Sequence, residues 1–354
     1  MFCTGAQKKT IGTSFRAYFV VCFENPMLCT WSQKETLALS CFLYLTSFGR
    51  ETKPPVSRVV VYFMENSMDR VKAKNIIIDK VKDLPTLPDV MHKVLTLVGD
   101  ESTSAKKLGS LISYDQSISS RLLKVANSAY YGFMRQITTV QHAIVILGFK
   151  EVKSLILGIA VFDTMKGASG ETSLGQKEFW MHSMGSALAG QIICKRVGKA
   201  DSETTFTASL LHDIGKLVLD VFFTQEYAKV LKNVRENGVS MVEVEEEVMG
   251  FSHADVGGWL CEKWKLPPAL TFPISFHHQV EKVDKSYMQM TSIVHLADIL
   301  CKRAHIGNSG DNKIPTIQLP AQENLNLKED ELEKIIEELK QEEDKVKSFL
   351  SAIQ

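Results

Sequence analysis

The sequence predicts an all-α protein. From Asn75 onward, apolar residues recur at the three- and four-residue spacing of amphipathic helices. Ser, Thr and Asp stand directly before several of these segments, where their side chains can accept hydrogen bonds from the first free N–H groups of a helix. No region is rich in strands, and the one short strand that the pattern allows is Val59 to Phe63. We therefore expect helices packed on one another around an apolar core.

Three helices are expected at the start of an N-terminal lobe, residues 75–165. Pro88 fits the first turn of the first helix, with Thr86 as its cap. Ser104 is expected to begin the second helix and Asp115 the third. Each helix then carries an apolar face, formed by Val90, Val94, Leu95 and Val98, by Leu108, Leu111 and Ile112, and by Ile118, Leu122, Leu123, Val125 and Ala126.

Two more helices complete this lobe after a turn at residues 127–132. Thr139 is expected to begin the helix Val140 to Leu147, with Gly148 in the left-handed αL conformation at its end. Val152 to Phe162 is almost entirely apolar, so the fifth helix should be buried.

A second helical lobe is expected over residues 176–303. Residues 166–175 are rich in Gly and Ser and predict a flexible connection before it, and residues 305–322 are loop-like. Residues 325–354 are expected to carry one charged amphipathic helix, Leu327 to Ile353. Its apolar face either packs back on the body of the protein or pairs with another chain, through Leu332, Ile335, Ile336, Leu339, Val346 and Leu350.

Residues 1–70 differ from the rest of the chain. Up to about residue 63, isolated apolar clusters follow no sustained period, and Pro54 and Pro55 interrupt the segment. We expect a poorly ordered extension or a start codon placed too early. The alternative is a small domain with its own partner.

The composition excludes several classes of protein. Hydrophobic residues at 45% and charged residues at 23% are typical of a globular chain. Because 41 basic residues balance 41 acidic ones, the charge gives no general attraction to nucleic acids or acidic membranes. The seven cysteines are odd in number and form no Cys-x-x-Cys pair, which favours a reducing, cytoplasmic setting without disulfides or a cysteine-rich zinc site. No apolar run is long enough to span a bilayer.

Eight acidic and histidine side chains stand where successive helices can bring them together. Glu178 and His182 are four residues apart and share a helix face. His212 and Asp213 are adjacent, and Lys216 follows Asp213 by three residues, on the same side of a helix. The full set of candidate metal ligands is Glu178, His182, His212, Asp213, His253, His277, His278 and Asp298.

A metal would remove the cost of burying this set. Asp213 and Asp298 are embedded among apolar residues, and an unpaired buried carboxylate costs on the order of several kcal/mol. Ion pairs with Lys216 and Lys302, three and four residues further on, are the competing explanation. Imidazole and carboxylate donors without thiolate suit Fe, Mn, Zn, Ni or Co, with Fe or Mn favoured. Eight donors exceed one tetrahedral site and suit two divalent ions bridged by a carboxylate.

Each residue also has an ordinary alternative role. Glu178 would be a solvated acid at a helix start, and one of His277 and His278 would lie outside the innermost ligands. Lys216 would be an exposed helix lysine rather than a phosphate contact.

The ordered set resembles the HD superfamily, through the pair His212-Asp213, the earlier His182 and the last ligand Asp298. Four further residues are similar to the extra ligands of the HD-GYP branch, namely Glu178, His253, His277 and His278. The wider framework resembles HDOD domains in the segments 84–88, 122–129, 137–148, 210–216 and 253–267. The resemblance covers about residues 75–303 and implies a two-lobed helical HDOD fold whose C-terminal lobe is an HD-type bundle.

Two departures from these families shape the expected function. No Gly-Tyr-Pro element follows His278, so the resemblance does not imply hydrolysis of cyclic di-GMP. Many HDOD domains have lost metal ligands, whereas this sequence keeps all eight.

Two functions are therefore expected. The first is a signal-transduction or regulatory protein with an intact di-metal site, whose partners are signalling proteins. The alternative is a metal-dependent phosphohydrolase acting on a phosphoester or nucleotide, with Asp213 and Lys216 as its catalytic residues and a small phosphorylated ligand. A weaker third hypothesis is an oxygen-handling di-iron site. No specific nucleic acid or membrane is expected as a partner, and the C-terminal helix could support an oligomer.

Overall fold

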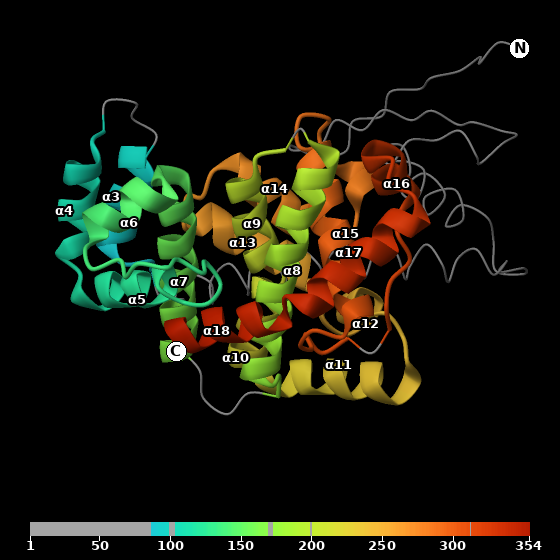
Figure 1. Ribbon diagram of the computed structural model, residues 1–354. Helices are drawn as coiled ribbons and strands as arrows, with labels where there is room; N and C mark the ends of the chain where they lie inside the picture. The colour runs from blue at the N-terminus through green and yellow to red at the C-terminus, as the bar shows by residue number, and fades with distance from the viewer. Residues whose placement is uncertain (1–85, 99–102, 169–172, 199, 312) are drawn as a thin grey trace, which may run out of the picture. The chain divides into compact units, whose positions relative to one another are not determined.

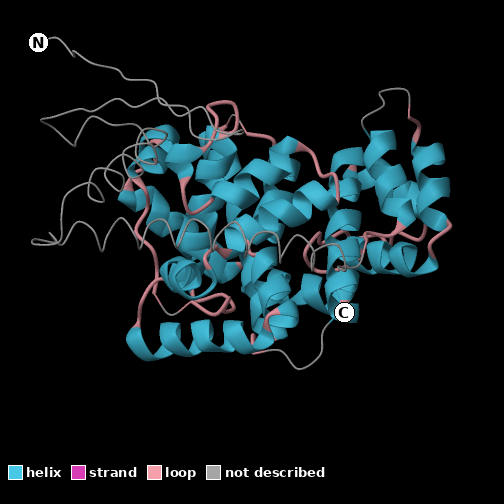
Figure 2. Cartoon of the chain, turned by 180° about the vertical axis from the view of Figure 1, so that it is seen from behind, coloured by secondary structure: helices cyan, strands magenta, loops and turns pink. Residues whose placement is uncertain are grey.

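The computed structural model describes residues 86–98, 103–168, 173–198, 200–311 and 313–354, and every regular element within these ranges is a helix (Figure 1, Figure 2). The all-α prediction is therefore confirmed. The described residues all belong to one compact unit, Ile76–Gln354. The expectations for residues 1–70, including the short strand, lie outside the described residues. No helix in the described part of the chain is long and apolar enough to cross a bilayer.

All five predicted helices of the N-terminal lobe are present. They are α3 (Asp89–Val98), α4 (Ala105–Ser113), α5 (Gln116–Ala126), α6 (Val140–Leu147) and α7 (Phe149–Ala168). The side chains of Ser104, Asp115 and Thr139 accept hydrogen bonds from backbone N–H groups three residues on, so these N-caps are confirmed. The αL prediction for Gly148 is wrong, because φ of 88° and ψ of 163° turn the backbone directly from α6 into α7.

The connection between the lobes is shorter than predicted. Helix α7 continues to Ala168, and residues 169–172 lie outside the described residues. The end of the connection is fixed because the buried carboxylate of Asp220 accepts hydrogen bonds from the N–H groups of Ser173 and Leu174, each at 3.0 Å.

Eight α-helices form the second lobe, and one of them is a buried central helix. They are α8 (Gln176–Val197), α9 (Ser202–Leu211), α10 (Ile214–Phe222), α11 (Thr224–Asn237), α12 (Met241–Met249), α13 (His253–Lys263), α14 (Pro268–Phe276) and α15 (Met288–Ala304), with a 3₁₀ turn, η3 (Val280–Lys282). The central helix is α8, whose residues from Phe179 to Gly190 are all buried and which packs against α9 and α15.

Close packing of α10 on α13 depends on a glycine. A Cβ atom on Gly215 would lie 2.0 Å from the carbonyl oxygen of His253, so only glycine allows this approach. The contact holds the start of α13 beside the start of α10.

The C-terminal segment forms two long helices, so the prediction of one continuous helix is wrong. After the short α16 (Leu319–Leu325), α17 (Glu329–Gln341) and α18 (Glu343–Ile353) meet at Glu342. The break allows α17 to pack on α15 and α8, while α18 packs on α8 and α5. The predicted apolar face is buried within this chain, as all six residues show: Leu332, Ile335, Ile336, Leu339, Val346 and Leu350.

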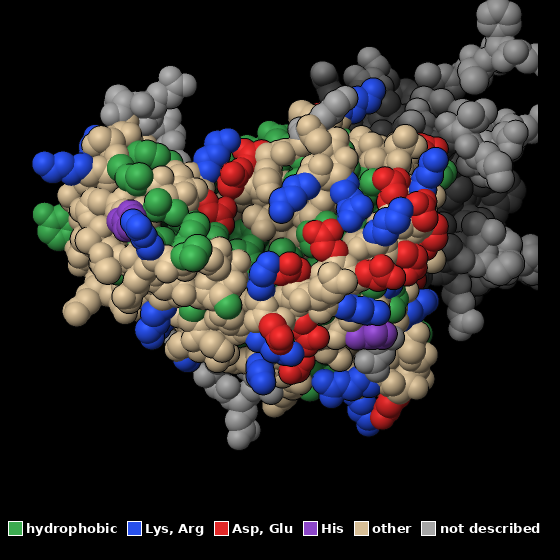
Figure 3. All heavy atoms as spheres, viewed as in Figure 1, with side chains coloured by type: hydrophobic (Ala, Val, Ile, Leu, Met, Phe, Trp, Pro, Cys, Tyr) green, Lys and Arg blue, Asp and Glu red, His purple; other side chains and the backbone are tan. Residues whose placement is uncertain are grey.

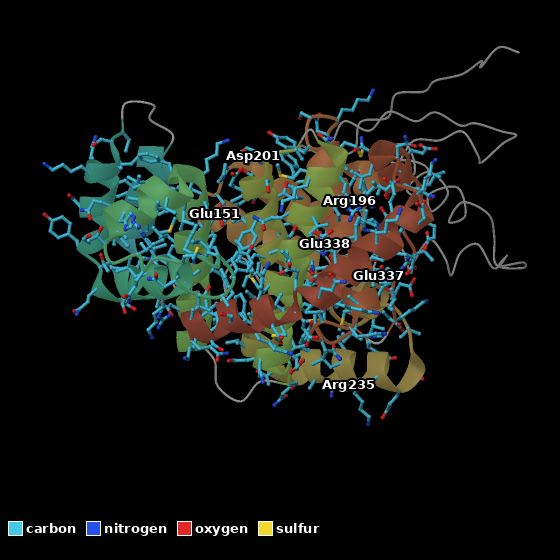
Figure 4. The ribbon with its side chains drawn as sticks, viewed as in Figure 1. Glu151, Arg196, Asp201, Arg235, Glu337 and Glu338 are labelled. Carbon is cyan, nitrogen blue, oxygen red and sulfur yellow. The ribbon has the colours of Figure 1, made fainter. Side chains whose placement is uncertain are left out.

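Contacts of α17 and α18 tie the C-terminal segment to both lobes. Arg196 of α8 forms an ion pair with Glu338 of α17 at 3.0 Å, and both residues are labelled in Figure 4. The ring of Phe349 lies 5.3 Å from that of Tyr130, near the N-terminal lobe's turn. Basic and acidic side chains are interspersed over this face of the molecule (Figure 3), as the balanced composition predicts.

We predict that Gly215→Ala lowers the free energy of unfolding by at least about 2 kcal/mol, because the new methyl group overlaps a backbone atom that cannot move aside. Urea denaturation measures the change. The matched control is Gly175→Ala, whose nearest heavy atom would be 3.9 Å away and which should change stability by less than about 1 kcal/mol. Equal effects of the two substitutions would contradict the close packing of α10 and α13.

Candidate metal centre

Helix ends bring most of the predicted ligands to one place in the second lobe. His212 follows the last residue of α9, and Asp213 precedes the first residue of α10, so the pair lies in the sharp turn between these helices. His253 is the first residue of α13, fixed by a capping box between Ser252 and Asp255. His277 directly follows α14. Residues separated by long stretches of sequence therefore meet because four helices start or end here.

The donor atoms form two groups, in each of which all atoms lie within 4.8 Å of one another. The first group is Asp213, His253, His277 and His278, and the second is His182, His212, Asp213 and Asp298. Asp213 belongs to both groups, because its Oδ1 lies 3.1 Å from His253 Nε2 and its Oδ2 lies 3.4 Å from His212 Nε2. One carboxylate thus joins the two sets of imidazoles.

Hydrogen bonds on the far side of three imidazoles direct their Nε2 atoms into the centre. His212 Nδ1 and His277 Nδ1 donate to the backbone carbonyls of Ser209 at 2.7 Å and Ile274 at 2.8 Å. Because a carbonyl oxygen can only accept, the proton is on Nδ1, and the Nε2 of each neutral ring offers a lone pair. His253 Nδ1 contacts Glu245 Oε2 in the same way, at 2.6 Å. Such partners orient metal-binding histidines in proteins.

Three buried polar atoms in the centre lack hydrogen-bond partners in the described structure. They are His212 Nε2, His277 Nε2 and Asp213 Oδ1. Asp213 Oδ1 is within ion-pair distance of His253 Nε2, but the two atoms do not have the geometry of a hydrogen bond. Buried polar atoms are rarely left unpaired. Divalent cations held by the two groups would satisfy all three, so the donor set fits a metal.

Lysine pairing, the competing explanation, is also present but satisfies only one side of each carboxylate. Lys216 Nζ donates to Asp213 Oδ2 at 2.8 Å, and Lys302 Nζ donates to Asp298 Oδ2 at 2.9 Å. The Oδ1 atoms of both carboxylates face imidazoles instead, and Asp298 Oδ1 lies 3.0 Å from His182 Nε2. The ion pairs therefore do not account for the unpaired nitrogens.

Burial and charge shift the pKa values of the histidines in two directions. Burial lowers the pKa of His277 to about 4, and it lowers the pKa values of His182 and His278 as well. These three rings are neutral at pH 7 and able to coordinate. Burial also acts to lower the pKa values of His212 and His253, but neighbouring carboxylates outweigh it and raise both to about 9.

The carboxylates stay ionised despite their burial. Burial raises the pKa of Asp213, but His212 and Lys216 outweigh it and hold the pKa well below its usual value. Burial has the same effect on Asp298, and Lys302 outweighs it most strongly. Both acids are therefore anionic donors at neutral pH.

Two of the predicted site residues, Glu178 and Lys216, lie outside the two groups. Glu178 is not in either group, because it belongs to the exposed first turn of α8, one turn before His182, and lines a cavity of about 150 Å³. That correction leaves seven of the eight candidate ligands together. Lys216 is fully buried, and its ammonium group contacts Asp213, Ser309 and Asp311, so it is not the exposed lysine of the ordinary alternative.

Sequence analysis missed two acids that support the centre. Glu245 contacts His253 and accepts a hydrogen bond from the Tyr227 hydroxyl at 3.2 Å, and it is fully buried. Its place on the apolar face of α12, beside Met241 and Val244, was the available signal. Asp311 bridges Lys216 and Lys302, and no local pattern marks it in the loop predicted at residues 305–322.

A histidine outside the two groups supports the ligands through the backbone. His295 Nδ1 donates to the carbonyl oxygen of His277 at 2.7 Å, and its Nε2 accepts from the N–H of Gln318 at 3.0 Å. The side chain of Gln318 in turn donates to the carbonyl of His278. These contacts fix the backbone beside His277 and His278.

Comparisons with known proteins give a family, a curated relative and related folds. The HDOD domain family matches residues 84–280. An uncharacterized protein of Treponema pallidum (strain Nichols) is 22% identical over 267 residues, which cover 75% of this chain and 50% of that protein. The chain therefore spans about half the length of this curated relative.

Two solved structures share the fold. An HDOD domain protein of unknown function from Geobacter sulfurreducens has a TM-score of 0.68 and 24% identity, covering 81% of this chain and 99% of that one. A protein from Shewanella amazonensis SB2B, provisionally named a phosphohydrolase, has a TM-score of 0.61 and 24% identity, covering 78% of this chain and 97% of that one. At this level of identity the likeness concerns the fold alone.

We predict that Glu245→Gln weakens divalent metal binding by about 10- to 100-fold, because the amide cannot supply the negative charge that holds and polarises His253. Competition with a metal-binding dye measures the affinity. Glu247→Gln removes an exposed acid from the same helix and serves as the control. If both variants bind metal as the wild type does, Glu245 has no role in orienting the ligand.

Metal affinity should rise as the pH increases from about 6 to 9, because His212 and His253 must lose protons before Nε2 can coordinate. The metal-free protein has the opposite dependence. The protonated His212 and His253 rings contribute fully to its folding stability below about pH 6.5, because their pKa values are raised in the folded protein. This contribution is lost as the pH rises toward 9. Calorimetric titrations in buffers of different ionisation enthalpy should detect proton release at pH 7. If metal binding neither releases protons nor depends on pH, His212 and His253 are not ligands.

Proposed function

The chain belongs to the HDOD domain family, and on that premise we propose that it is a metal-binding signal-transduction protein with two divalent cations in its second lobe. The observation that carries this proposal is the burial of the donor atoms. Six of the seven clustered residues are at most 1% exposed, namely His182, His212, Asp213, His253, His277 and Asp298. A closed centre can hold cations and stabilise one arrangement of helices, but it gives a large substrate little access.

The two faces of Asp213 support a bridged pair of cations. Oδ1 faces His253 and His277 at 3.1 and 3.7 Å, whereas Oδ2 faces His182 and His212 at 3.7 and 3.4 Å. Each oxygen would therefore bind a different ion. Three imidazoles and a carboxylate would hold one ion, and two imidazoles and two carboxylates the other. Such nitrogen and oxygen donors favour Fe or Mn, with Zn, Ni or Co as alternatives.

The helices that carry the ligands also contact the N-terminal lobe, which gives metal binding a route to a signalling surface. Helix α9 ends directly before His212 and packs on α7, and α8 carries His182 and packs on α18. Helix α18 in turn packs on α5 of the N-terminal lobe. Changes at the centre would alter how these helices pack, and the partners would be other signalling proteins.

A metal-dependent phosphohydrolase is the second candidate, and one observation favours it. His278 is half-buried, so the first group of donors has a side that is nearer to solvent. When bound, a pair of divalent ions activates water and binds phosphate oxygens. A small phosphoester could approach on the side of His278.

We predict that the double variant His212→Ala, Asp213→Ala loses nearly all bound metal, because it removes the carboxylate that both groups share and one imidazole of the second group. Elemental analysis of purified protein should find about two ions per chain in the wild type, as a bridged site requires. His142→Ala, an exposed histidine of α6, should retain the wild-type content. Stripping the metal should lower the free energy of unfolding by about 3 kcal/mol for each ion that was bound at a hundred times its Kd. If the double variant binds as much metal as the wild type does, the proposed site is wrong.

The metal-loaded protein should release no phosphate from p-nitrophenyl phosphate, nucleoside monophosphates or cyclic dinucleotides beyond the metal-free control. The reason is that six of the donors are closed off from solvent. Phosphate release measures turnover. Turnover that scales with metal content and disappears in His278→Ala would replace the signalling proposal with the phosphohydrolase.

A further inference from the structure

A second buried charge cluster lies beside the candidate metal centre and contacts two of its carboxylates. Lys216 Nζ lies 2.8 Å from Asp311 Oδ2, and Lys302 Nζ lies 2.8 Å from the same oxygen. Ser309 Oγ lies 3.1 Å from Lys216 Nζ. Two ammonium groups and a hydroxyl thus converge on a single carboxylate oxygen, and the side chains of Lys216, Lys302 and Asp311 are 0%, 8% and 7% exposed.

The lysines connect this cluster to both groups of metal donors. Lys216 contacts Asp213, which both groups share, and Lys302 contacts Asp298 of the second group. Asp311 itself is not a member of either group. It reaches the candidate centre only through the two lysines.

The segment that carries Asp311 is held against the start of α8. The N–H of Asn308 donates to the carbonyl of Glu178 at 2.9 Å. Gly307 has a φ of 65°, and a Cβ atom there would lie 2.2 Å from the backbone nitrogen of His182. The segment 306–311 thus covers the backbone of a predicted metal ligand, and glycine is required for it to do so.

Two buried ammonium groups with a hydroxyl match the charge and the hydrogen-bonding needs of a tetrahedral oxyanion. Phosphate accepts several hydrogen bonds at once, whereas a carboxylate of the protein fills only part of such a site. The carboxylate of Asp311 is attached to the chain, so its local concentration beside the lysines is high. A free anion must compete with it for the two ammonium groups.

We propose that Lys216, Lys302 and Ser309 form a binding site for a phosphate group beside the metal centre, and that Asp311 is an internal anion that blocks this site. The inference rests on the proposed function, because it names the ligand class and a means of regulation for the same centre. A phosphate group of orthophosphate or of a small phosphomonoester would displace Asp311 and release the segment 306–311 from α8. Asp311 then acts as an autoinhibitory contact.

Asp311→Asn tests the proposal because it preserves the shape of the side chain and removes its charge. Binding of orthophosphate and of methyl phosphate is measured by calorimetry, on metal-free and on metal-loaded full-length protein. We expect about a tenfold or larger gain in affinity in the variant, the lower end of couplings measured for close charge pairs. Adding Lys302→Met to Asp311→Asn should abolish the gain. Asp330→Asn, which removes an exposed acid paired with Lys334, should leave phosphate affinity unchanged. A preference for one of the two ligands identifies the source of the phosphate group.

Hydrogen exchange of the wild-type protein gives a test that does not depend on the variant folding. Saturating phosphate should increase exchange in residues 306–311, because the hydrogen bond from Asn308 to Glu178 opens when Asp311 leaves. Unchanged protection, or an Asp311→Asn variant that folds and binds phosphate no more tightly, would overturn the proposal.

Metal content measured in the same samples separates this inference from the proposed function. If the wild type binds no metal, the proposed function fails, while the phosphate comparison on metal-free protein still decides the role of Asp311. Loss of metal in Asp311→Asn without a gain in phosphate affinity would make Asp311 a support for the metal ligands and would contradict the blocked anion site.

Discussion

The buried carboxylate of Asp213 is the group on which the rest of the second lobe depends. It is 1% exposed, in the turn between α9 and α10, and it stays ionised because positive groups surround it. A buried charge must be balanced by close and well-oriented partners. Lys216 and Lys302 cannot provide the whole balance, since they also face two further carboxylates, Asp298 and Asp311. The remaining positive charge has to come from protonated imidazoles when the centre is empty, or from cations when it is filled.

The fold brings the partners of Asp213 together because several helices start or end beside it. Gly215 lets α13 approach closely enough for His253 to reach Asp213. Glu245 and two backbone carbonyls turn three imidazoles inward. The same helices continue outward to α7 and α18, so the elements that hold the centre also pack against the N-terminal lobe. A protein that senses a metal or an anion needs such continuity between its binding site and its interaction surface.

Sequence reasoning predicted the features that local chemistry determines. The caps at Ser104, Asp115 and Thr139 and the apolar helix faces follow from contacts between residues three or four positions apart. The sequence also predicted seven of the residues that cluster in the second lobe. Glu178 was predicted from its spacing and from the resemblance to the HD-GYP ligands, but it lies in the exposed first turn of α8, outside both groups, because four-residue spacing gives a shared face and not its burial. The break at Glu342 and the contacts of Asp311 depend on packing between distant segments, and Asp311 lies 95 residues from Lys216.

Anomalous diffraction at the absorption edge of the bound metal tests the central claim most directly. Crystals of the protein purified with its own metal should show two peaks about 3.5–4 Å apart, one on each side of the Asp213 carboxylate. The peak near Oδ1 should lie among His253, His277 and His278, and the peak near Oδ2 among His182, His212 and Asp298. A metal bound elsewhere, or metal-loaded crystals without a peak beside Asp213, would contradict the account.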